Sequence, residues 1–211
     1  MELFEISDRI DTRLKSFEAG ISVDEYEKSL YLSKVQKDIY YEYLKAFEDT
    51  QVISYDLKPF VVDYITSTQA TPPVSAIQGS QVFQMPDNVA KIIYESAVIA
   101  NRFTRVIPIR ISDANYKMES PFRTPNRDET LRVIREGDVA ELLAYDTVDE
   151  YRVKYFEEIE PIILEDLPDD LTIDGIKIAN NTKFNDDILN KIIDITVKLI
   201  LGDASVFAKQ Q

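Results

Sequence analysis

The stretch that decides the fold is residues 22–49, SVDEYEKSLYLSKVQKDIYYEYLKAFED. Ser22 and Glu25 have the spacing of a capping box, and Asp24 adds negative charge to the first turn, so a long helix is predicted here. Its apolar side chains form two stripes on nearly opposite sides, Leu32, Val35, Ile39, Tyr43 and Ala46 on one and Tyr26, Leu30, Tyr40, Tyr41 and Leu44 on the other. A helix that is apolar on two sides is covered on two sides, either as a central core helix or with a partner molecule on the second side.

The rest of the chain predicts further helices at both ends and strands between them. Helices are expected at 2–18, at 56–66 and at 185–208, and residues 67–80, rich in Ser, Thr, Gln and Pro, predict a loop. From residue 81 the hydrophobic period becomes two, and the expected strands are 81–85, 91–99, 105–111, 130–135, 140–145 and 150–156. Between two β-branched runs, Asp174-Gly175 indicates a type I′ hairpin turn.

This order of elements predicts an α+β fold with N-terminal helices, a central, mostly antiparallel β region with hairpins, and a long C-terminal helix. The length fits one structural domain over residues 1–211. Its expected parts are a helical part at 1–66, a loop at 67–80, a β-rich part at 81–180 and a C-terminal helix at 185–208.

The chain contains no histidine and no cysteine. This composition excludes Ser–His–Asp and Cys–His nucleophiles, an imidazole general base, and zinc sites built from Cys and His. The start of the chain is acidic and lacks the basic region of a signal peptide, and no apolar run reaches the roughly 18 residues of a membrane span, so no membrane association is expected. The composition therefore favours a structural or binding role over catalysis.

Acidic residues are the remaining candidates for chemistry. Asp166, Asp169, Asp170 and Asp174 lie close in sequence, but their spacing is too irregular for a calcium loop, so a solvated acidic loop is favoured. A carboxylate pair within 157–160 could serve a hydrolase, although sequence proximity does not define the separation that such a pair needs. Phosphate-binding glycine motifs are absent, so the chain is expected to bind no cofactor and no metal.

The net charge of −14 is unevenly distributed along the chain. It is −6 over residues 1–70, +1 over 71–140 and −9 over 141–211. Most basic residues of the middle third are arginines: Arg102, Arg105, Arg110, Arg123, Arg127, Arg132 and Arg135. Such a chain is a poor binder of nucleic acid and better suited to an acidic protein surface, such as the 141–174 segment of another copy of itself. The alternative is that these arginines flank strands and form ion pairs within one chain.

Several segments resemble small structural proteins of crAss-like bacteriophages. Residues 22–36 resemble their "LDEYEKSVFLTKAQ" segment, and Phe4–Asp11 resembles the "EFSDRFD" opening. Val106–Ile109 and Ser120–Pro125 are similar to the "VVPI…NPFRKP" region, and the order of a "PIIL" segment, a hairpin and a closing helix is also shared. The chain departs from the family's "LHPEIL" lead into the last helix, since 184–189 contain neither His nor Pro.

The resemblance implies a head–tail connector protein that forms a homo-oligomeric ring, of 12 copies, in the neck or tail region of the virion after assembly in the host bacterial cytoplasm. It implies contact with the portal or neighbouring rings, around a channel through which DNA passes without specific binding. The alternatives are a tail or baseplate accessory protein and, less favoured, a carboxylate-dependent hydrolase. The residues expected at the subunit or partner interface are Tyr26, Tyr31, Tyr40, Arg105, Arg110, Phe122, Arg123 and Arg127.

Overall fold

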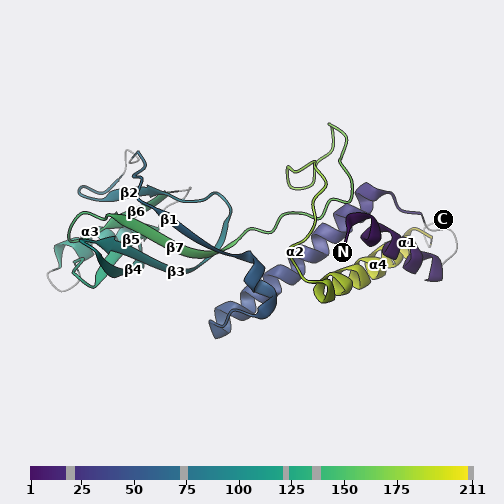
Figure 1. Cartoon of the computed structure of the whole chain (residues 1–211), viewed down its shortest axis with the longest axis horizontal. Coiled ribbons are helices and arrows are strands. Elements are labelled where there is room, and N and C mark those ends of the chain that lie inside the picture. The colour runs from purple at the N-terminus through teal and green to yellow at the C-terminus, as the bar shows by residue number, and fades with distance from the viewer. Residues whose placement is uncertain (18–21, 72–75, 121–123, 135–138, 209–211) are drawn as a thin grey trace. The chain divides into compact units, whose positions relative to one another are not determined.

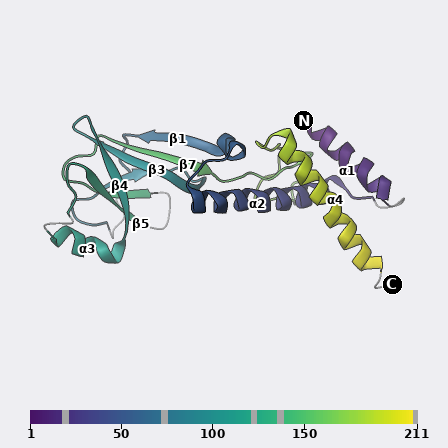
Figure 2. The same ribbon diagram turned by 90° about the horizontal axis from the view of Figure 1, so that it is seen from below.

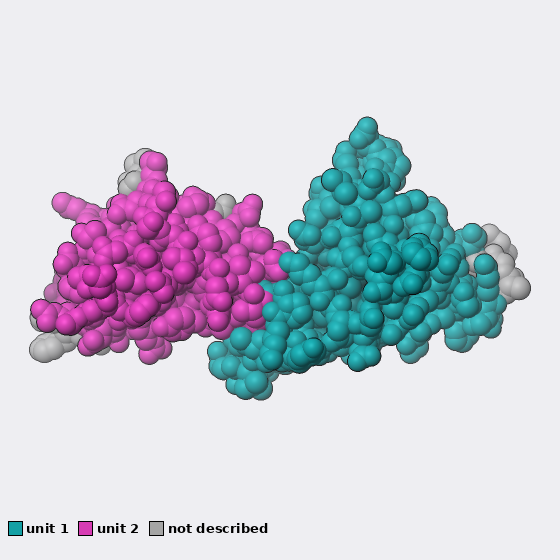
Figure 3. Space-filling view, viewed as in Figure 1, with its two compact units in different colours: residues 1–60, 159–211 teal, residues 61–158 magenta. Residues whose placement is uncertain are grey.

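A computed structural model describes residues 1–17, 22–71, 76–120, 124–134 and 139–208. The chain divides into two compact units, coloured separately in Figure 3. Unit 1 combines residues 1–60 with 159–211, and unit 2 consists of residues 61–158. Unit 2 is therefore an insertion between the two halves of unit 1, and the expectation of a single structural domain stays a prediction.

The α-helices described in unit 1 are α1 (Leu3–Phe17), α2 (Glu25–Thr50) and α4 (Asp186–Ala208). The helix expected at 2–18 is confirmed, and its Ile6, Ile10 and Leu14 are buried at spacings of four, whereas Phe17 at its end is exposed. α4 packs against both α1 and α2 (Figure 2). The start of α4 agrees with the sequence, since the Asn185 side chain accepts a hydrogen bond from the Ile188 amide at 3.0 Å.

The long second helix is confirmed, but its cap and its second face differ from the expectation. Asp24, rather than Ser22, is the N-cap residue and accepts a hydrogen bond from the Glu27 amide at 2.8 Å. On the second stripe, Tyr40 and Leu44 are buried while Leu30 and Tyr41 are exposed. On the first stripe Leu32, Val35 and Ile39 are buried while Ala46 is exposed, so unit 1 covers both sides of α2 in part.

The prediction of a helix at 56–66 is wrong. A short 3-10 helix, η1 (Tyr55–Phe60), leads directly into strand β1 (Val61–Thr66). Pro59 lacks the backbone N–H that a continuing helix needs, and the β-branched pair Val61-Val62 suits a strand. Pairing of β1 with the strand at 150–157 then decides the conformation, because it satisfies the backbone of residues 61–66.

Unit 2 is a seven-stranded curled sheet with the order β1-β7-β3-β4-β5-β6-β2 (Figure 1). After β1, its strands are β2 (Gln81–Gln84), β3 (Val89–Ile99), β4 (Arg102–Arg110), β5 (Glu129–Ile134), β6 (Val139–Leu143) and β7 (Glu150–Glu157). Among the described residues, every strand pair is antiparallel except β4 with β5, so the expected mostly antiparallel α+β fold is confirmed. A short helix, α3 (Ile111–Glu119), follows β4.

The sheet ends at Glu157, whereas the sequence predicted a β-rich part that continues to residue 180. Beyond β7 the chain is extended and forms isolated bridges, between Ile163 and Asn180 and between Ile173 and Ile176. The turn itself is confirmed, because Asp174 and Gly175 both have the positive φ that a type I′ turn requires. In Figure 1 this yellow-green segment forms a double loop between β7 and α4.

The corrected cap of α2 gives a direct test. Asp24→Ala should lower the free energy of unfolding by about 0.5–2 kcal/mol, because the Glu27 amide loses its partner and the helix start loses a negative charge. Ser22→Ala should stay within about 0.5 kcal/mol of the wild type. Urea unfolding followed by circular dichroism compares the two variants, and a larger loss from Ser22→Ala would contradict the assignment.

Candidate functional site

The two N-terminal segments that carry the family resemblance meet in one buried polar network. Lys28 is 2% exposed, and its Nζ lies 2.8 Å from both Asp11 Oδ1 and Glu25 Oε1. Nζ also donates to Ser7 Oγ at 3.0 Å, and Ser7 donates to Glu25 Oε1 at 2.8 Å. Burial lowers the pKa of Lys28, but the hydrogen bonds and charges of Asp11 and Glu25 outweigh it and raise the pKa above its ordinary value. The network therefore joins α1 to α2.

Polar side chains of α2 also hold the extended segment that returns from unit 2. Ser29 Oγ accepts from the Leu164 amide, and Ser33 Oγ donates to the Ile162 carbonyl, both at 3.0 Å. Gln36 Nε2 donates to the Glu160 carbonyl at 2.7 Å. Residues 29, 33 and 36 lie on one face of a helix, so these three side chains support the returning segment inside unit 1.

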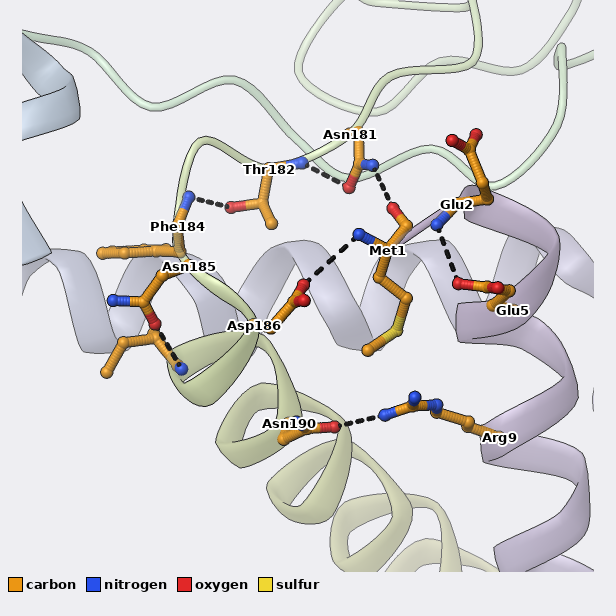
Figure 4. A network of polar contacts seen from close by, with 11 residues as sticks. Met1, Glu2, Glu5, Arg9, Asn181, Thr182, Phe184, Asn185, Asp186 and Asn190 are labelled. Carbon is orange, nitrogen blue, oxygen red and sulfur yellow. Dashed lines mark hydrogen bonds and ion pairs between the residues drawn. The ribbon is translucent and has the colours of Figure 1, made fainter.

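A third polar network fixes the beginning of the chain against the start of α4 (Figure 4). The amino group of Met1 lies 3.3 Å from Asp186 Oδ1, and Asn181 Nδ2 donates to the Met1 carbonyl at 2.9 Å. Further along, Arg9 of α1 donates to Asn190 Oδ1 of α4 at 2.7 Å. These contacts hold α1 beside α4 without any His or Pro at 184–189.

The three tyrosines expected at an interface belong to unit 1, where they are buried or half-buried. Tyr40 is 0% exposed and packs on Phe60, with 5.0 Å between ring centroids, so its ring has no surface left for a partner. Tyr26 is half-buried against the cluster of Ile163, Leu167 and Ile173. Tyr31 is also half-buried. A contact of Tyr26 or Tyr31 with a partner stays a prediction.

Arginines of the expected interface lie in unit 2. Arg105, Arg110 and Arg127 are exposed, and Phe122 and Arg123 lie outside the described residues. Arg132 agrees with the alternative that the arginines form ion pairs within one chain, because its Nε lies 2.6 Å from Glu95 Oε1. The structure therefore leaves Arg105, Arg110 and Arg127 with side chains at the surface.

The Arg132–Glu95 pair continues into the core of the sheet. The hydroxyl of the fully buried Tyr151 donates to Glu95 Oε1. Burial raises the pKa of Tyr151 far above its usual value, and the charge of Glu95 raises it further. Tyr151 thus stays protonated and keeps its hydrogen bond to Glu95, while Arg132 compensates the charge of that carboxylate.

A groove of about 600 Å³ opens above this ion pair, between β3 and β4. Its lining includes the β3 segment from Val89 to Glu95 and, from the neighbouring strands, Arg105, Val106, Pro108 and Arg132. Beside it lies a second hollow of about 530 Å³ on the sheet face, and Tyr94 borders both.

Large apolar side chains project from this sheet face. Ile65, Tyr94 and Phe103, on three different strands, are 57%, 56% and 64% exposed. Arg152 lies over the Phe103 ring at 4.8 Å, and Lys154 lies 3.3 Å from Asp63. Aromatic and arginine side chains that are exposed together are typical of protein interfaces. We refer to Ile65, Tyr94, Phe103 and Arg152 as the sheet-face patch.

The sequence analysis did not single out this patch. A partial signal was present in β4, where Phe103 lies at an exposed position next to the buried Thr104, whereas β3 shows no alternation of burial around Tyr94. Recognising the patch, however, requires the strand order, which places β1, β7, β3 and β4 side by side.

Two further observations concern other classes of site. Across the described ranges, no three acidic residues lie close enough together to hold a metal ion. In that same part of the chain, no helix is both long and apolar enough to cross a membrane. The absence of a metal requirement stays a prediction.

Substitution of the buried Lys28 tests whether its polar network stabilises the fold. Lys28→Ala should lower the free energy of unfolding by about 1–3 kcal/mol, below the roughly 3–5 kcal/mol of fully buried pairs because Asp11 and Glu25 are partly exposed. Lys34→Ala, at an exposed position of α2, should cost less than about 0.5 kcal/mol. Because the pKa of Lys28 is raised, its contribution is complete below 10.5 and is lost as the pH rises through the higher folded value. Equal losses of unfolding free energy in Lys28→Ala and Lys34→Ala would contradict a stabilising role of Lys28.

Comparison with known proteins identifies the family of this chain. The family model described as phage tail ring protein 3/4 matches residues 1–210. Ring protein 3 of Bacteroides phage crAss001 is 34% identical over 215 residues, which cover 93% of this chain and 94% of the relative. Ring protein 4/5 of the same phage is 27% identical over 220 residues, with 94% and 92% covered. The chain therefore belongs to the phage tail ring protein 3/4 family and is a structural ring protein of a crAss-like phage virion.

Proposed function

We propose that this protein forms one homo-oligomeric ring, of 12 copies, in the head–tail connector, where it contacts the portal or the neighbouring rings around the DNA channel. The ring itself follows from the family. The copy number and the place in the neck rest on the resemblance to crAss-like phage proteins. The sheet-face patch is the observation that carries the proposed subunit contact, because three large apolar side chains are exposed side by side on one sheet.

The charge of the protein supports passage of DNA without binding. Unit 1 carries 23 acidic and 13 basic residues, and unit 2 carries 15 and 11. Phosphates are repelled by a net negative wall, and a protein with few contacts to them retains DNA weakly. A ring of these subunits would let the genome move through without specific contacts.

One alternative position has a specific observation in its favour. The family description places its members in the tail, so this ring could lie within the tail rather than at the portal. Both positions require the same ring contacts, and binding to purified portal protein distinguishes them. We propose no enzymatic activity, since membership of a structural ring family and the lack of His and Cys favour a structural role over a carboxylate-dependent hydrolase.

Assembly of the purified chain tests the proposal. Mass photometry over a concentration series, with and without the portal protein, should show a multi-subunit species for the wild type. Phe103→Asp should raise the concentration at half-assembly by about tenfold or more, because it places a charge in the patch. Val52→Asp is the matched control, since Val52 is equally exposed but lies in unit 1. A wild-type protein that stays monomeric under all conditions, with and without the portal protein, would contradict the proposal.

A further inference from the structure

On the sheet face that carries the patch, Arg105 is a basic side chain without a carboxylate partner. It is exposed, and within the described ranges it forms no ion pair, not even with Glu129, its register neighbour on β5. The other basic side chains of this face are already paired with carboxylates: Arg152 with Glu150 and Lys154 with Asp63. Arg105 therefore remains available to a carboxylate of another molecule.

Arg105 lies beside the apolar hollow of the sheet-face patch. It follows Phe103 by two residues, so both side chains lie on one face of β4, about 6.5 Å apart along the strand. Across the ladder Arg105 is paired with Ser96, which lines the hollow together with Ile65 and Tyr94. The hollow of about 530 Å³ has room for an aromatic ring. This surface therefore fits a partner whose exposed aromatic side chain lies a similar distance from an unpaired carboxylate.

The start of α1 has both features. Phe4 is 67% exposed, and Asp8 is an exposed carboxylate without a hydrogen bond or ion pair in the described part of the chain. Residues i and i+4 lie on one helix face, about 6 Å apart along its axis, so the spacing of Phe4 and Asp8 matches the spacing on the sheet. Met1, held by Asn181 and Asp186, fixes this end of α1 (Figure 4).

Other exposed apolar side chains of unit 1 fit this surface less well. On α2, Leu30 and Tyr41 are also exposed, at 40% and 51%. Each of them lies one turn before an exposed lysine, Lys34 and Lys45 respectively. These lysines would face Arg105, and two like charges in contact are unfavourable. The start of α1, which has a carboxylate at the equivalent position, is the better match.

We propose that the sheet-face patch of one subunit binds the start of α1 of a second copy, with the Phe4 ring in the hollow and Asp8 paired with Arg105. This proposal rests on the proposed ring function. The two surfaces belong to different units of the chain, so the contact is heterologous. A heterologous contact generates a closed ring when its rotation closes, which a self-complementary contact between two copies does not.

A charge exchange tests the pairing. Asp8→Lys should raise the concentration at half-assembly by about tenfold or more, as should Arg105→Glu, because each variant places like charges opposite each other. The double variant should assemble within about threefold of the wild type. Neither residue has an ion pair within the chain, so the single variants should unfold at the urea concentration of the wild type.

A matched control separates this contact from a general effect of charge. Arg102→Glu makes the same change on the same strand, at an exposed residue whose side chain alternates to the opposite face from Phe103, and should assemble normally. Phe4→Ala, which leaves the charges intact, should also raise the concentration at half-assembly by about tenfold or more. Normal assembly of Asp8→Lys or Phe4→Ala, or no recovery in the double variant, would overturn the proposal.

Cross-linking provides a second readout that does not depend on the charge variants. The chain contains no cysteine, so Thr12→Cys offers a single attachment point, one turn after Asp8, for a photoreactive maleimide. In rings mixed from ¹⁴N and ¹⁵N copies, cross-linked peptides should join residue 12 of one isotope to 89–110 of the other, and Lys45→Cys should not form them. Rings without such peptides would refute the α1 contact but leave the ring function intact, whereas failure of the wild type to form rings would refute both.

Discussion

The rest of the structure depends on the hydrogen bonds between side chains of helix α2 and the extended segment 159–164, which follows unit 2. Unit 2 is inserted between the two halves of unit 1, so residues 159–164 must pass back along α2 in an extended form. The buried backbone groups of such a segment need hydrogen-bond partners. Ser29, Ser33 and Gln36 provide them from one face of the helix. Without these side chains, the second half of unit 1 would leave polar groups buried and unpaired, at a cost of about 1–3 kcal/mol each.

This arrangement separates the two roles of the chain. The segments that resemble crAss-like phage proteins at the N-terminus build the interior of unit 1, where Lys28 joins α1 to α2. Exposed apolar side chains occur on both units, but on unit 2 three of them, Ile65, Tyr94 and Phe103, lie with Arg152 along one hollow of the sheet face. The account therefore assigns support to the buried polar residues of α2 and subunit contact to the sheet.

Local signals predicted those parts of the fold that local physics determines. The stripe of Ile6, Ile10 and Leu14, the Asn185 cap and the Asp174-Gly175 turn all follow from spacing and residue type. The helix expected at 56–66 failed because pairing with β7, a long-range contact, converts residues 61–66 into a strand. Long-range contacts also explain why the sequence did not reveal the burial of Tyr40 or the sheet-face patch. Periodicity cannot reveal that Tyr40 packs on Phe60, or that Phe103 and Tyr94 lie on one face.

Hydrogen–deuterium exchange of the free chain and of the assembled ring tests the division of roles most directly. The account predicts that amides of 90–95 and 103–108 gain protection on assembly, because they lie at the groove and the sheet-face patch. Amides of 29–36 and 160–164 should be equally protected in both states, since their partners lie within one chain. Protection gained at 160–164, with none at 90–95 or 103–108, would contradict the account.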